Sequence, residues 1–329
     1  SFVINLIFSN NFHLTYPRVL KFILIIGSIL SFKQLLLGFK STEINKLYKI
    51  WSIIFVIVIF DIIFELIFKI NVIGLKSFMP GRVASFSGNE LNIGHFFSAF
   101  SLIFMSFVYV NYKNISLNLI IGILLITISF LIGERSNFIK TLLIISAFIF
   151  LIHQIKVKYK ILSFSSLIIF FIIMLNLNPG YKLRYLDQFT KVLTKEGINY
   201  YFDNTVYGAH YNVAKEIFKD NKFFGVGIKN FRIESFSNKY ADLDHKQNNR
   251  RANTHPHQVH YEFLAETGLV GYFSFALFVC FSFYLAIKNY IKSRNLFQLS
   301  GIFYVLISLL PLLPSGSFFS TYTSSLFWL

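Results

Sequence analysis

The stretch LNLIIGILLITISFLIG, residues 117–133, contains no charged side chain and consists mainly of Leu and Ile. A helix needs about 20 largely apolar residues to cross the hydrocarbon core of a bilayer, so this stretch is typical of a membrane span. Similar stretches occur on both sides of it, at residues 19–39, 48–68, 93–110, 137–153, 160–177, 259–287 and 296–314, and a ninth is expected to begin at Phe318. The sequence therefore predicts an all-α, polytopic transmembrane helical bundle.

The composition supports the same fold class. Hydrophobic residues make up 55% of the 329 positions and aromatic residues 19%, which excludes an ordinary soluble domain. The only cysteine, Cys280, lies in an apolar run and excludes an intrachain disulfide or a CxxC motif. The chain opens at Ser1 without a Met and stops within an apolar stretch, so we expect that further membrane segments precede and follow it.

The longest hydrophilic stretch lies between the sixth and seventh spans, at residues 178–258, and is too long for a simple connection. Within it, NTVYGAHYNVAKEIF (204–218) has the apolar spacing of an amphipathic helix. We therefore expect three regions: transmembrane helices in residues 1–177, a mostly helical extramembrane domain in 178–258, and further transmembrane helices in 259–329.

The charges near the span ends predict the orientation. Alternate short loops carry Lys40, Lys46, Lys49, Lys113, Lys156, Lys158, Lys160, Lys288, Lys292 and Arg294. The positive-inside rule places these loops in the cytoplasm. The outer side then has residues 69–92, the Glu134–Arg135 turn, the 178–258 domain and 314–317. The net charge of +16 leaves a positive excess there, which favours an anionic ligand such as a phosphorylated lipid over nucleic acid.

Three histidines and two glutamates crowd the stretch THPHQVHYEFLAETG, residues 254–268. Thr254 as N-cap and Pro256 in the first turn would start a helix there. Helical spacing then separates two faces, one with His257, His260, Tyr261 and Leu264, the other with His255, Val259, Glu262 and Glu266.

The chemistry of this stretch leaves several interpretations open. The positive end of a helix dipole disfavours protonation of a histidine, so His257 is the candidate proton acceptor in a reaction with a phosphate leaving group. The histidines could instead be simple interfacial residues. A metal site is disfavoured, because no further cluster with ligand spacing accompanies them, and we predict no cofactor.

Charged residues near the outer side are further candidates. Arg135 could bind an anion or pair with Glu134, and Arg82 could bind an anion or only snorkel to the interface. FFGVGIKNFR, residues 223–232, combines glycines with two cations and could cradle an anion or form a solvated turn. For the intramembrane acids Asp61 and Glu65 we favour an internal salt bridge to one of the arginines over a functional role.

Five segments in order resemble the motifs of the O-antigen ligase and O-antigen polymerase superfamily. They are GRVASFSGNELNIGHFF (81–97), LIGERSNF (131–138), DNKFFGVGIKNF (220–231), THPHQVHYEFLAETGLVG (254–271) and PSGSFF (314–319). The resemblance implies a multi-pass, metal-independent, inverting glycosyltransferase of the bacterial inner membrane. Its active site would face the periplasm and use an undecaprenyl-diphosphate-linked glycan donor.

The resemblance also implies roles for individual residues. The essential histidine of the family maps to His257, and the periplasmic arginines that hold the diphosphate map to Arg82 and Arg135. Gln258 stands where Asn is usual in the family. An arginine of the outer-domain helix is replaced near His210, and Lys229 and Arg232 could compensate as substrate-binding cations.

The predicted mechanism gives each candidate a place. His257 takes the proton of the acceptor hydroxyl while the two arginines neutralise the leaving diphosphate. His255, His260 and Tyr261 would orient the acceptor or the base, and Glu266 would support the helix.

Polymerase activity is our first interpretation and ligase activity, with lipid A core as acceptor, the second. A transporter of lipid-linked glycans is the alternative from another class, but neither internal repeats nor midplane charges favour it. The expected partners are the donor, the glycan or lipid A core acceptor, membrane lipids and a chain-length regulator protein.

Overall fold

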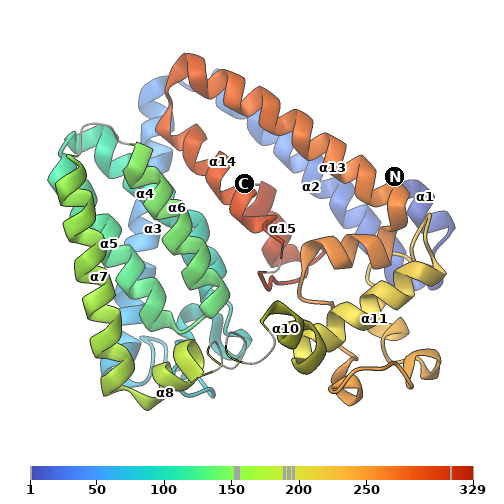
Figure 1. Cartoon of the computed structure of the whole chain (residues 1–329). Helices are drawn as coiled ribbons and strands as arrows, with labels where there is room; N and C mark the ends of the chain where they lie inside the picture. The colour runs from blue at the N-terminus through green and yellow to red at the C-terminus, as the bar shows by residue number, and fades with distance from the viewer. Residues whose placement is uncertain are drawn as a thin grey trace. The chain divides into compact units, whose positions relative to one another are not determined.

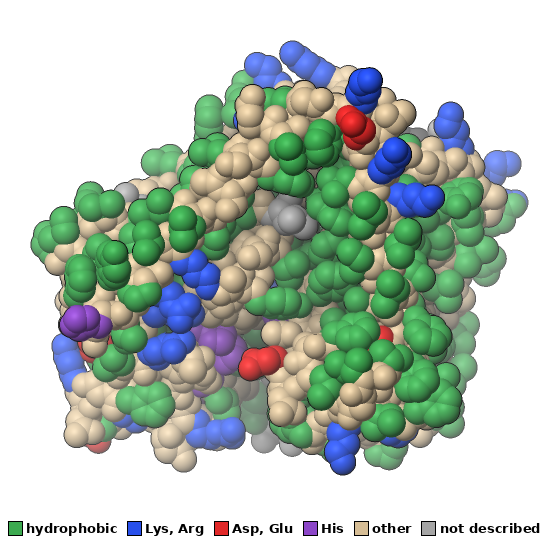
Figure 2. Space-filling view, turned by 180° about the vertical axis from the view of Figure 1, so that it is seen from behind, with side chains coloured by type: hydrophobic (Ala, Val, Ile, Leu, Met, Phe, Trp, Pro, Cys, Tyr) green, Lys and Arg blue, Asp and Glu red, His purple; other side chains and the backbone are tan. Residues whose placement is uncertain are grey.

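The computed structural model describes residues 2–151, 156–187, 190, 194, 197–311 and 313–328, and no strand occurs among them. Six helices are long and apolar enough to cross a membrane (Figure 1), namely α2 (Phe12–Gly38), α3 (Ser41–Phe68), α4 (Ile93–Tyr112), α5 (Ile115–Ile132), α7 (Val157–Leu177) and α13 (Val259–Ser293). Exposed apolar side chains cover much of the surface in Figure 2. These findings confirm the predicted polytopic helical bundle.

The remaining predicted spans correspond to shorter helices. The 137–153 stretch forms α6 (Arg135–Leu151) and the 296–314 stretch forms α14 (Leu296–Ser308). The ninth stretch forms α15 (Thr321–Trp328). At 1.5 Å per residue, α14 is about 20 Å long and is too short to cross a hydrocarbon core of about 30 Å by itself.

The chain divides into two compact units, which are described separately. The first unit comprises Ser1–Gly38, Val192–Lys292 and Ser308–Leu329, and the second comprises Phe39–Lys191 and Ser293–Ile307. This division differs from the three consecutive regions that the sequence predicts. The reason for the difference is that the ends of the chain pack against the extramembrane segment. For example, the Thr15 hydroxyl donates to the Ile228 carbonyl at 3.2 Å.

The second unit is a bundle of α3, α4, α5, α6, α7 and α14, with η1 (Ser85–Glu90), α8 (Pro179–Tyr181) and the π-helical turn η2 (Lys182–Asp187) at one end. Small polar side chains join its helices, such as Ser98 to Thr141 at 2.9 Å. The segment around Arg82 and the segment around Arg184 both contact the end of α5. In the first of them, the Val83 amide donates to the Ile132 carbonyl at 3.0 Å. Three loops that the sequence places on the outer side therefore meet at one end of this unit.

The two acidic residues in α3 have a different role from the predicted one. Glu65 accepts hydrogen bonds from the backbone amides of Ala84 and Ser85, and Asp61 accepts from the Ser85 hydroxyl at 2.6 Å and the Val72 amide at 2.9 Å. The expected salt bridges to arginine are wrong, because backbone amides and the Ser85 hydroxyl of the 71–85 loop already bond to both carboxylates. The acids fix the loop that carries Arg82.

The first unit contains α1 (Phe2–Ile7), α2, α10 (Ile198–Asn204), α11 (Val206–Asp220), α12 (Phe231–Glu234), η3 (Asn238–Tyr240), η4 (Asn248–Arg250), α15 and α13 up to Lys292. The predicted amphipathic helix is confirmed as α11. Its apolar face enters a core made of Val213, Ala214, Ile217, Val226, Phe231, Tyr240 and Ala265. Burial of that face holds the extramembrane helices against the start of α13.

Helix α13 is interrupted at Gly268, whose φ is +63°. The amides of Leu269 and Val270, which the break frees, donate to the carbonyls of Lys222 and Phe223 at 2.8 and 3.1 Å. A side chain at Gly225 would come within 2.4 Å of the Glu266 backbone. The glycines of FFGVG and AETG thus allow two backbones to touch. The 225–230 segment is buried and is not the solvated turn expected there, whereas an anion-binding role stays a prediction.

The orientation makes a labelling prediction. In a Cys280→Ser background, a cysteine at Asn238 should react with a membrane-impermeant maleimide applied from the periplasmic side, because we expect the 178–258 segment to lie there. A cysteine at Asn289, near the other end of α13, should react only after the membrane is permeabilised. Both positions are exposed, so reversed labelling would contradict the orientation rather than report burial.

Candidate active site

The helix that follows the histidine-rich stretch starts later in the sequence than predicted. Helix α13 begins at Val259, and Gln258 caps it: the side-chain oxygen of Gln258 accepts from the Tyr261 amide at 3.0 Å. The Thr254 hydroxyl bonds instead to Asn253 and His255. The expected N-cap at Thr254 is therefore wrong.

The predicted helical faces do not include the first two histidines either. His257 has φ of +58°, in the left-handed region that few side chains adopt, so the chain cannot be helical there. This turn leaves His255 and His257 in the loop before the helix. Such a backbone conformation persists only where the surrounding structure enforces it, and the Ser315 amide donates to the His257 carbonyl at 2.8 Å.

Three imidazole rings meet in the first unit. The ring centroid of His257 lies 4.0 Å from that of His255 and 5.3 Å from that of His210, which comes from α11. The ring of Tyr207, one turn before His210, approaches His257 edge-on at 5.3 Å. The structure therefore brings together three of the predicted site residues, and Tyr207 is an addition that the sequence did not single out.

Burial keeps these imidazoles neutral. Loss of water lowers the pKa of His257 to about 4, against an opposing hydrogen bond with the Ser315 backbone. Burial, together with the neighbouring His257, lowers the pKa of His210 to about 4 and that of His255 well below its ordinary value. Desolvation, rather than the predicted helix dipole, is the main cause.

Two ring nitrogens in this cluster are buried without a hydrogen-bond partner among the described residues: Nδ1 of His210 and Nε2 of His255. The other nitrogen of each ring is engaged, His210 with the Arg250 carbonyl at 3.1 Å and His255 with the Thr254 hydroxyl at 3.0 Å. Within the part of the chain that the structure describes, no group of three His, Cys, Asp or Glu side chains is placed to hold a metal ion.

Two other residues of the motif point elsewhere. His260 uses both ring nitrogens internally, with the Tyr272 hydroxyl at 3.0 Å and the Leu309 carbonyl at 2.8 Å. Tyr261 stacks on Tyr211 at 4.9 Å and packs against the core. Both side chains therefore have internal contacts, and a role toward the substrate stays a prediction for them.

The buried acids of α13 hold the loops that surround the histidines. Glu266 accepts from the Lys229 amide at 2.8 Å and the Phe231 amide at 3.3 Å. The Lys229 ammonium lies 3.8 Å from Glu262, whose carboxylate also accepts from the Phe318 amide at 2.7 Å. Lys229 is buried in this ion pair and bonded to Ser317, so it is not the accessible substrate cation that the sequence predicted.

The other candidate cation of that segment, Arg232, lies in α12 and is half-buried. Its Nε is buried and has no hydrogen-bond partner among the described residues. A role toward substrate stays a prediction for this residue.

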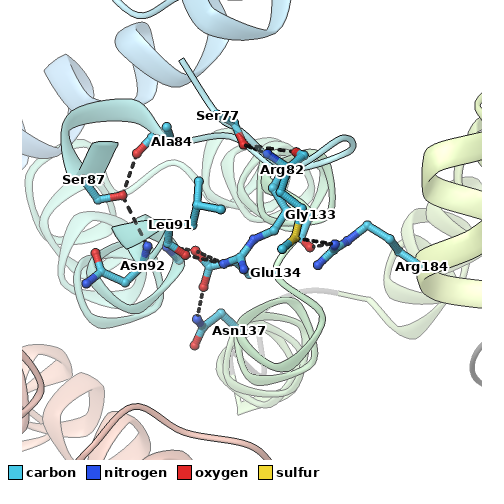
Figure 3. Close-up of polar contacts among 12 residues, drawn as sticks. Ser77, Arg82, Ala84, Ser87, Leu91, Asn92, Gly133, Glu134, Asn137 and Arg184 are labelled. Carbon is cyan, nitrogen blue, oxygen red and sulfur yellow. Dashed lines mark hydrogen bonds and ion pairs between the residues drawn. The ribbon is translucent and has the colours of Figure 1, made fainter. Parts of the chain in front are cut away.

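The second unit contains a set of arginines at its loop end. Arg82 forms a salt bridge with Glu134 at 3.2 Å and also bonds to the Leu91 carbonyl (Figure 3). Glu134 accepts in addition from the Gly94 amide at 3.0 Å and from Asn137. The alternative in which Glu134 pairs with Arg135 is wrong, since Arg82 occupies that position.

Arg135 is the first residue of α6 and donates to the Arg184 carbonyl at 3.4 Å. The guanidinium of Arg184 donates to the Gly133 carbonyl at 3.1 Å and contacts the Met79 sulfur at 3.2 Å (Figure 3). Sequence reasoning missed Arg184, although it follows the 160–177 span on the side where Arg82 and Arg135 were expected. Three guanidinium groups and the Glu134 carboxylate leave this set with an excess of two positive charges.

A cleft of about 280 Å³ lies beside Arg82 in the same unit. Its lining includes Lys69, Ser77, Arg82, Asn178 and Tyr181, together with apolar side chains such as those of Leu66, Phe78, Met79 and Leu131. The volume lies just below the usual range for ligand pockets, which starts at about 300 Å³.

Comparison with known proteins finds a family similar to part of the chain. Residues 120–276, from α5 to the middle of α13, match the family described as O-antigen ligase, and this range contains Arg135, His210 and the histidine turn. No curated protein matches the chain. The family match spans both the arginine turn and the histidine cluster. The match covers a little less than half of the chain, and the order of the motifs along the chain agrees with this similarity to the O-antigen ligase family.

Proposed function

We propose that this protein is an O-antigen polymerase-type glycosyltransferase. It joins undecaprenyl-diphosphate-linked oligosaccharide units at the periplasmic face of the bacterial inner membrane. The observation that carries the proposal is the cluster of half-buried and buried imidazoles, held neutral, around His257, because a neutral imidazole can accept a proton from a sugar hydroxyl.

The proposed reaction is a single displacement. The acceptor hydroxyl transfers its proton to His257 as its oxygen bonds to the anomeric carbon of the donor glycan. The bond between that carbon and the diphosphate oxygen breaks with inversion, and undecaprenyl diphosphate leaves with the bonding electrons. Protonated His257 then releases the proton to solvent.

The arginines serve the leaving group. Arg82 and Arg135 neutralise the diphosphate, and Arg184 joins them as a third cation in the same unit. Guanidinium groups suit this task because they donate two parallel hydrogen bonds to phosphate oxygens. With these cations, the charge of the leaving group needs no metal ion.

Ligase activity is the second candidate, because the matching family is described as O-antigen ligase. In that case the same donor and the same base serve a different acceptor, the lipid A core. Donor, acceptor and membrane lipids are the partners common to both candidates, and a chain-length regulator protein is the further partner of a polymerase.

A deletion strain tests the proposal. Loss of a polymerase should leave lipopolysaccharide capped with a single repeat unit, and a plasmid-borne copy should restore long chains. Bare core with accumulated lipid-linked polymer would instead assign the protein as a ligase. Purified protein in detergent should also join glycan units without a transmembrane gradient, and failure to do so while restoring transport in vesicles would favour a transporter.

A further inference from the structure

The histidine cluster has unused hydrogen-bonding capacity on both sides of His257. Among the described residues, Nδ1 of His210 and Nε2 of His255 are buried and meet no hydrogen-bond partner at normal geometry, with the Ser315 backbone near His255, although each belongs to a ring that contacts the His257 ring. A buried polar atom without a partner destabilises the protein. Two such atoms around one base indicate a ligand that supplies hydrogen-bonding groups to both.

Tyr207 adds an aromatic surface at the same place. Its ring is half-buried and lies 5.3 Å from the His257 ring and 6.2 Å from that of His210, at steep angles of 74° and 79°. The Thr205 hydroxyl fixes this start of α11 by accepting from the Gly208 amide at 3.0 Å. The ring is therefore held in place next to the base, whereas Tyr211 in the following turn is buried in the core.

The electrostatics distinguish between two classes of ligand. Burial holds all three histidines neutral, so the cluster offers no charge of its own to a diphosphate. Of the basic groups whose charge acts on the cluster, Lys229 is paired with Glu262, and Arg250, whose carbonyl oxygen bonds to His210, is exposed. A neutral ligand with several hydroxyl groups and an apolar face fits this surface better than a phosphate does.

We propose that Tyr207, His210 and His255 form the acceptor subsite, which binds the sugar ring whose hydroxyl His257 deprotonates. The inference rests on the proposed function and adds to it the residues that recognise the acceptor. The apolar face of a pyranose stacks on the Tyr207 ring, and neighbouring hydroxyls bond to the two unpaired nitrogens. Binding in this way orients one hydroxyl toward His257.

A binding experiment tests the subsite without relying on turnover. The probe is the methyl glycoside of the repeat-unit oligosaccharide, which has neither lipid nor phosphate, and saturation-transfer NMR in nanodiscs measures its affinity. We expect Tyr207→Ala to weaken binding about 10-fold, the upper end of aromatic contact energies converted to an affinity ratio. Tyr207→Phe, which keeps the ring, should bind within about 2-fold of the wild-type protein.

Two further variants complete the test. His255→Phe keeps a planar ring but removes the unpaired nitrogen, and it should also weaken the probe. Phe236→Ala removes an aromatic side chain that is 65% exposed in the same unit, and it should change nothing. Inorganic diphosphate should fail to displace the probe, and donor affinity should stay normal in all four variants.

The outcomes separate this inference from the proposed function. Equal probe affinity in Tyr207→Ala and Phe236→Ala, or displacement of the probe by diphosphate, would overturn the subsite even if the wild-type protein joins glycan units. Probe binding that depends on Tyr207 in a protein that never transfers glycan would support the subsite and refute the glycosyltransferase.

Discussion

Replacing His257 with Asn should reduce the rate of glycan transfer by about 100- to 10,000-fold, the usual contribution of a general base, while the lipid-linked donor still binds. Asn is the substitution of choice because, among residues with a side chain, it tolerates the left-handed backbone that His257 adopts. The loss then reports the missing imidazole rather than a displaced loop. Single-turnover transfer and donor binding, measured separately on the same preparation, give the two quantities.

The pH dependence supplies an independent check on the same residue. Burial lowers the pKa of His257 to about 4, so the base is protonated, and lost, only as the pH falls through about 4. We expect kcat/KM to stay level from pH 7 down to about 5, whereas an exposed histidine would lose activity near 6.5. His210 has a similar pKa and touches His257, so the acid limb belongs to the pair.

His260→Asn is the matched control for the first prediction. It removes a histidine of the same motif whose nitrogens have internal partners, and it should affect stability more than the pH profile. Normal transfer in His257→Asn, or a donor affinity that falls as far as the rate, would show that His257 is not the base.

Replacing Arg135 with Ala should weaken donor binding and also slow transfer, with about a 100- to 1000-fold loss in kcat. Both quantities fall because the same cation faces charge in the bound donor and more of it in the departing diphosphate. Arg135 is the first residue of α6, and the positive end of that helix adds to its attraction for an anion. Donor titration and single-turnover rates measure the two effects.

Arg135→Lys should recover only part of the loss, since an ammonium group cannot form two parallel bonds to phosphate oxygens. Lys76→Ala removes an exposed cation of the neighbouring 69–92 loop and should leave both quantities unchanged. If Arg135→Ala and Lys76→Ala behave alike, the diphosphate is held elsewhere.

The membrane helices could be predicted because their signal is local. A run such as 117–133 is apolar wherever the rest of the chain lies, and the bilayer requires its backbone to be helical. The start of α13 could not be predicted in the same way. Both Thr254 and Gln258 can cap a helix, and the choice depends on the turn at His257, which the distant Ser315 amide supports.

The candidate site was predictable in its residue types but not in its pairings. His257 and the arginines stood out through charge next to apolar runs. Which arginine pairs with Glu134, or which histidine meets His257, depends on contacts between segments far apart in the chain. His210 joined the candidate list only through the family resemblance, and its ring contact with His257 is a product of the fold of α11.

The break at Gly268 has a consequence for how this protein responds to its lipid environment. Beyond the break, residues 269–293 form a helix of about 37 Å, longer than a hydrocarbon core of about 30 Å, and a helix with such mismatch tilts when bilayer thickness changes. Residues 259–267 are instead fixed to the extramembrane loops through Glu262 and Glu266. The amides of Leu269 and Val270 are also bonded to the carbonyls of Lys222 and Phe223, so tilt of the longer segment must be absorbed beyond Val270, and the break itself moves together with the extramembrane loops.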